Sequence, residues 1–184
     1  LIANATQQMA LFGLMTYFAA YMIESYGWDE ANAAPGLALL GVGAVIGSFA
    51  GGFIAGRARR LDWLAGISLA GGVVAGLLFA LDAPAWIVVA MAFVASVLVS
   101  VSMPVLMTLI MHLAGQSRGT AGGMFSTSNQ FGGVVGASAG GLMLSLGGFP
   151  AVGLLYLFAT VVSVSVIGFI MRRSPEFRLG GAGT

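Results

Sequence analysis

The sequence is divided into six long apolar runs, each separated from the next by a short polar segment. The runs cover about residues 6–26, 36–56, 63–81, 85–113, 120–146 and 151–171. A helix needs about 20 apolar residues to cross a bilayer, and these runs have about that length. Only 7% of the residues are charged, against roughly 25% in soluble domains, which leaves too few charges to cover a soluble fold. The sequence therefore predicts an all-α membrane protein with six transmembrane helices.

The charged residues indicate how these helices cross the membrane. All seven basic residues are arginines, and they follow the second, fourth and sixth runs. The opposite side holds only acidic residues. Because positive charge is retained on the cytoplasmic side, we expect both ends in the cytoplasm, with residues 172–184 forming a cytoplasmic tail. The expected location is the bacterial cytoplasmic (inner) membrane. The arginines are Arg57, Arg59, Arg60, Arg118, Arg172, Arg173 and Arg178, and the acids opposite are Glu24, Asp29, Glu30 and Asp82.

One glycine-rich pattern occurs twice in the chain, 89 residues apart. Residues 43–54 read GAVIGSFAGGFI and residues 132–143 read GGVVGASAGGLM, with six of twelve positions identical. Glycines four residues apart leave one helix face bare, so that a neighbouring backbone can approach closely. The two copies run in opposite directions through the membrane, which predicts two inverted three-helix repeats over residues 6–81 and 85–171. The alternative is chance, because small-residue faces are common in membrane helices.

Three motifs support a family resemblance. The segment GFIAGRARR, from Gly52 to Arg60, resembles the G-x-x-x-D-R-x-G-R loop of the major facilitator superfamily, with Gly56 and Arg59 departing from that pattern. The segment SRGTAGG at residues 117–123 resembles the entry to the fifth helix of a family half. The run GMFSTSNQFGGVVGASAGG resembles the family's glycine-rich fifth-helix motif, with Ala137 in place of proline.

The resemblance covers nearly the whole chain and implies one six-helix half of a transporter. We interpret it as the C-terminal half, because the loop motif lacks its aspartate and the fourth run contains no arginine. The implied partners are the lipid bilayer, a small-molecule substrate and a second six-helix half, in the same chain or another protomer. We expect no nucleic acid partner.

The resemblance also implies that the first and fourth helices of the half line the transport cavity. Polar and methionine side chains at helical spacing in these runs are candidate substrate contacts, as is the polar run STSNQ in the fifth helix. Packing between helices is the alternative for all of them, with each tyrosine hydroxyl bonded to a neighbouring carbonyl. The candidates are Tyr17, Tyr21, Ser100, Met103, Met107, Asn129 and Gln130.

A second set of residues is predicted to act in gating and helix packing. Pro104 lacks an N–H and leaves the carbonyl of Ser100 without its helical partner, so a kink is expected there. The arginines are expected to hold the cytoplasmic ends at the headgroups and to bridge the two halves. The full set is Gly47, Gly51, Gly52, Arg57, Arg60, Pro104, Arg118, Gly132, Gly136 and Gly140.

These observations predict a half of a secondary active transporter that moves a small, neutral or amphipathic solute by alternating access. The prediction of a neutral solute depends on the absence of charged residues near the middle of any run. The alternative is a scaffold or assembly subunit that keeps the fold without transporting. We expect no enzyme, cofactor or metal site, because the chain has one His, no Cys and no catalytic motif. The chain begins with Leu and has no charged leading segment, so we expect neither a native start nor a signal peptide.

Overall fold

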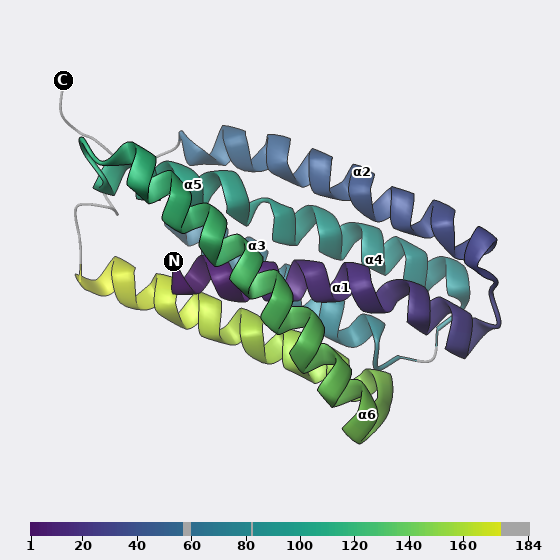
Figure 1. The fold of residues 1–184 in the computed structure, drawn as a ribbon. Helices are drawn as coiled ribbons and strands as arrows, with labels where there is room; N and C mark the ends of the chain where they lie inside the picture. Colours follow the sequence, from purple (N-terminus) through teal and green to yellow (C-terminus); the bar gives the residue numbers. More distant parts are fainter. Residues whose placement is uncertain (57–59, 82, 174–184) are drawn as a thin grey trace.

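The structure is a computed structural model that describes residues 1–56, 60–81 and 83–173, without the side chains of residues 60–62 and 170–173. All regular elements in these ranges are α-helices, which confirms the predicted all-α class (Figure 1). They are α1 (Ile2–Tyr26), α2 (Glu30–Ala55), α3 (Arg60–Leu78), α4 (Ala85–Ser100), α5 (Ser102–Leu113) and α6 (Arg118–Arg173).

The helical path is interrupted at two places that agree with the sequence: between the fifth and sixth apolar runs, and within the fourth run. Within α6, Gly147 and Gly148 have non-helical backbone angles, and Gly148 has a φ of 68°, which glycine adopts without a Cβ clash. They separate a first arm (residues 118–146) from a second arm (residues 149–173). The fourth apolar run is divided at Val101 into α4 and α5, three residues before Pro104. Each of the six apolar runs is therefore helical.

Some helices begin earlier than predicted. α2 starts at Glu30 rather than about residue 36, because the Asp29 side chain caps it by accepting a 2.7 Å hydrogen bond from the Asn32 N–H. The polar loop predicted over residues 27–36 is correspondingly shorter. α1 begins at Ile2 rather than about residue 6, and it ends at Gly27, whose φ of 66° forms a left-handed cap.

Three helices are long and apolar enough to cross a bilayer within the described residues: Glu30–Ala55, Ala85–Leu113 and Arg118–Phe169. The second of these spans α4 and α5, and the third includes both arms of α6. The Trp63–Leu78 part of α3 is a shorter apolar helix. These helices indicate an integral membrane protein, and six crossings stay a prediction.

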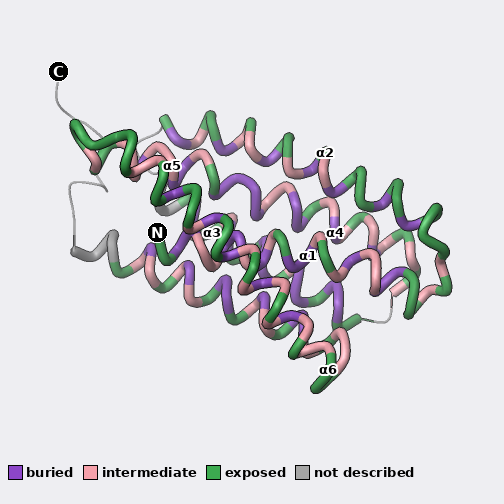
Figure 2. The backbone as a smooth tube through the Cα atoms, viewed as in Figure 1, coloured by how far each residue is buried: buried purple, intermediate pink, exposed green. Residues whose placement is uncertain are grey.

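The helices form an up-and-down bundle around α1. Figure 1 shows the starts of α1 and α6 and the ends of α2 and α5 at one end of the bundle, and the turn inside α6 at the other. α1 contacts every other helix, most extensively α6, while α2 packs on α4 and α3 packs on α4 and α6. Leu14, Phe18 and Met22 of α1 are fully buried. Exposed segments lie mainly on outward faces, as along α2 in Figure 2.

Candidate functional site

The first glycine face lets α2 approach α4 backbone to backbone. A Cβ atom added at Gly47 would overlap the carbonyl oxygen of Val97, and one at Gly51 would overlap that of Val101. Gly51 thus lies against the break between α4 and α5. Gly52, grouped with these glycines from its sequence position, is exposed with nothing within 4 Å of an added Cβ, so it takes no part in this contact.

The second glycine face makes the same kind of contact between the first arm of α6 and α1. A Cβ atom at Gly132 would overlap the carbonyl oxygen of Ala5, and one at Gly136 would lie 2.5 Å from that of Met9. One turn further, Gly140 lies against the ring of Tyr17. Apart from Gly52, the glycines predicted to mediate packing therefore lie in close helix contacts at both copies of the pattern.

The two candidate tyrosines of α1 face neighbouring helices. The Tyr17 hydroxyl donates a hydrogen bond to the carbonyl of Ala137 in the first arm of α6. Tyr21 is only 5% exposed, and its hydroxyl lies 3.5 Å from the carbonyl oxygen of Leu81. These hydrogen bonds correspond to packing between helices, which the sequence analysis gave as the alternative to substrate contact. The exposed side of α1 carries Phe12 and Thr16 instead.

A buried amide cluster joins α1 to both arms of α6. The side-chain amide of Asn4 donates to the Asn129 side-chain oxygen and, at 2.7 Å, to the Ser128 hydroxyl. The Gln7 amide donates to the Ser163 hydroxyl at 3.1 Å, and that hydroxyl donates to the carbonyl of Ala3 at 3.1 Å. Because buried amides are costly without partners, these bonds stabilise the α1–α6 contact.

Sequence reasoning identified Asn129 and the polar run that contains Ser128, and it missed Asn4, Gln7 and Ser163. The missed signal is three amides, Asn4, Gln7 and Gln8, at the spacing of one helix face. The first apolar run was started at about residue 6, which left Asn4 outside it. The Gln7 side-chain oxygen is buried without a hydrogen-bond partner among the described residues. Gln130, by contrast, is exposed.

The candidates of α4 and α5 do not face one common space. Ser100 is 3% exposed and lies beside Gly47. Met103 is 40% exposed, and Met107 is half-buried against the core. The ring of Pro104 lies beside Gly51. The structure thus places Ser100 and Pro104 in the α2 contact and leaves Met103 on an open face.

The predicted gating arginines are described only in part. Arg118 is the first residue of α6 and is exposed. Arg57 lies outside the described residues, and Arg60 begins α3 without a described side chain. No three His, Cys, Asp or Glu side chains of the described ranges come together as a metal site.

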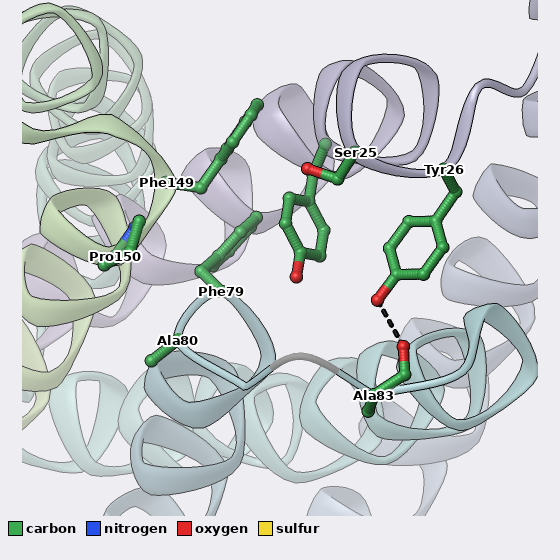
Figure 3. A pocket seen from close by; sticks show the side chains of 8 residues that line it. Ser25, Tyr26, Phe79, Ala80, Ala83, Phe149 and Pro150 are labelled. Carbon is green, nitrogen blue, oxygen red and sulfur yellow. Dashed lines mark hydrogen bonds between the residues drawn. The ribbon is translucent and has the colours of Figure 1, made fainter.

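A pocket of about 540 Å³ lies at the end of the bundle where α1 finishes. We call it the end pocket. Figure 3 shows Ser25 and Tyr26 of α1 facing Phe79, Ala80 and Ala83 across this space, with Phe149 beside it. The Tyr26 hydroxyl donates a 2.5 Å hydrogen bond to the carbonyl of Ala83. Its lining residues are Tyr21, Ser25, Tyr26, Phe79, Ala80, Ala83, Phe149 and Pro150.

Comparison with known proteins agrees with this architecture. No curated protein matches the chain. The family model described as Major Facilitator Superfamily matches residues 1–182. That match covers almost all of the 184 residues and confirms the resemblance inferred from the glycine-rich motifs. The chain therefore belongs to the major facilitator superfamily.

Proposed function

We propose that the chain is one six-helix half, the C-terminal one, of a secondary active transporter that works by alternating access. The observation that carries the proposal is the family match over residues 1–182, since this family consists of transporters. A six-helix half needs a second half to enclose a solute site at the midplane. That second half comes from the same chain or from another protomer.

The packing of the glycines supports an inverted-repeat origin for the two groups of three helices. If the first helix corresponds to the fourth and the second to the fifth, a contact of α2 with α4 should reappear as a contact of the first α6 arm with α1. One of the three contacts differs, because Gly51 faces the carbonyl of Val101 whereas Gly140 faces the ring of Tyr17. In the other two, each glycine is matched by one 89 residues later and each carbonyl partner by one 88 residues away. The pairs are Gly43–Phe93 with Gly132–Ala5, and Gly47–Val97 with Gly136–Met9.

The chemistry of the buried residues favours a neutral or amphipathic solute. The buried polar residues in the described ranges are Asn, Gln, Ser and Thr, and none is charged. Charged side chains at membrane depth are costly and mark proton or ion pathways. A half without buried charged side chains is suited to binding a solute through hydrogen bonds and apolar contacts. Any charged residue that couples transport to an ion would then belong to the other half.

Labelling at Thr16 tests this proposal, because Thr16 lies on the exposed side of α1 and the chain contains no native Cys. Thr16→Cys is expressed in the full-length protein, with any cysteine of the second half replaced by serine. The protein is treated with a membrane-impermeant thiol reagent in right-side-out and inside-out vesicles. Alternating access predicts reaction from both sides without ion leakage. Leu154→Cys, 67% exposed on the second arm of α6, is the lipid-facing control and should react from neither side.

The other outcomes contradict the proposal in different ways. Protection of Thr16→Cys from both sides supports the sealed scaffold instead. Reaction from one side only indicates a static vestibule, and reaction from both sides with ion leakage indicates a channel.

A further inference from the structure

The end pocket has the lining of a headgroup site. Four of its eight lining residues are aromatic. The Tyr21 and Phe149 ring centroids lie 4.9 Å apart. Tyr26 and Phe149 are half-buried, so part of each ring faces the pocket. Tyrosine and tryptophan collect at the level of lipid headgroups in membrane proteins, and Trp28 follows Tyr26 by two residues at this end of the bundle.

A narrow apolar groove of about 130 Å³ runs between α3 and the second arm of α6. We call it the α3–α6 groove. Its base is a close crossing of backbones, where a Cβ at Gly76 would lie 3.2 Å from the carbonyl oxygen of Gly153. Its walls include Leu77 and Leu154, which are 44% and 67% exposed. The volume of this groove is smaller than the roughly 300–1,000 Å³ of sites for drug-sized ligands. It is therefore suited to part of one linear hydrocarbon chain.

The groove and the end pocket adjoin each other. Ala80 and Pro150 line both of them. A partly aromatic, partly polar space at the end of the bundle therefore lies next to an apolar groove along its side. This combination matches an amphiphile with its head at the membrane surface and its chain along the protein.

We propose that this site binds a membrane phospholipid whose headgroup carries an ammonium group. The rings of Tyr26 and Phe149 present π-faces that attract a cation. Glu24 precedes Ser25 in α1 and is exposed. None of the seven arginines follows an apolar run that ends at this end of the bundle. An anionic headgroup would therefore find no cationic side chain among the residues that line the pocket. The acyl chain lies in the α3–α6 groove, where burial of each methylene is favourable.

Lipid titration of the purified full-length protein, followed by native mass spectrometry, tests the proposal. The probes are phosphatidylethanolamine and phosphatidylglycerol with identical acyl chains. We expect the ethanolamine lipid to bind about tenfold more tightly, since the two lipids differ only in the headgroup. Equal binding of both lipids to the wild-type protein would overturn the proposal.

Ala80→Trp is the blocking variant, because Ala80 is exposed and lies where pocket and groove meet. It should remove the preference for the ethanolamine lipid. Ala70→Trp places the same side chain at an exposed alanine within α3 that lines neither space, and this variant should bind both lipids as the wild type does. Unchanged binding in a folded Ala80→Trp protein also overturns the proposal.

Phe149→Leu gives an independent test if Ala80→Trp does not fold. It removes one aromatic face and leaves the groove intact. The loss of one cation–π contact should weaken ethanolamine-lipid binding roughly two- to fivefold and leave glycerol-lipid binding unchanged. Equal weakening of both lipids, or of neither, contradicts recognition of the ammonium group.

Discussion

Asn129 and Gln130 show how strongly a single position decides a residue's role in this bundle. They are neighbours in the same polar run, and both are amides. Asn129 is 9% exposed and accepts a hydrogen bond from Asn4, whereas Gln130 is exposed. A rotation of about 100° around the helix axis separates them, which is enough to place one in the α1 contact and the other outside it.

This difference predicts unequal effects of two matched substitutions. Asn129→Ala leaves the Asn4 amide without one acceptor and should lower the free energy of unfolding by about 1–2 kcal/mol. Gln130→Ala removes no described bond and should change it by less than about 0.5 kcal/mol. Denaturant titration in detergent micelles measures both values. Equal stability of the two variants would show that the amide cluster contributes nothing.

At the scale of the helices, close backbone contact replaces the hydrophobic effect that is missing within lipid. Gly47 brings α2 onto Val97 of α4, and the break at Val101 lies against Gly51. Pro104 explains why the run breaks there, since it cannot donate to the carbonyl of Ser100. The break and the glycine face therefore belong to one helix contact.

Two glycine substitutions five residues apart test this contact. Gly47→Ala places a methyl group against the Val97 carbonyl and should destabilise the protein by about 1–3 kcal/mol. Gly52→Ala faces open space within the same helix and should stabilise it by up to about 1 kcal/mol through higher helix propensity. The thermal stability of each variant is measured by heating the protein and following the folded fraction by size-exclusion chromatography. A shift of the same sign and size for both would contradict the packing.

At the scale of the whole molecule, the bundle alternates in direction. Arg118, which follows Ser117, begins the first arm of α6 at one end, and Asp29 caps α2 at the other. The positive-inside rule then predicts that the end with Arg118 faces the cytoplasm. The predicted membrane orientation depends on the positions of the charged residues. The direction in which each helix runs is given by the fold.

Single cysteines at the two ends test the orientation. Ala31→Cys and Ser117→Cys replace exposed residues in a chain without native Cys. An impermeant maleimide should label Ala31→Cys on intact cells and Ser117→Cys only after permeabilisation, because the charges predict opposite sides. The reverse pattern contradicts the orientation, and labelling of both from one side contradicts the alternation.

The sequence by itself determined the helical class, the six runs, the turn at Gly147–Gly148 and the family. These follow from local composition and from motifs within a few residues of each other. Only the tertiary structure decided that Gly47 packs while Gly52 does not, that Tyr17 bonds to Ala137, and which amides are buried. The physical reason is that each of these contacts depends on how far a helix is rotated about its own axis. That rotation is set by tertiary contacts, which in the case of α1 and α6 join residues more than a hundred positions apart.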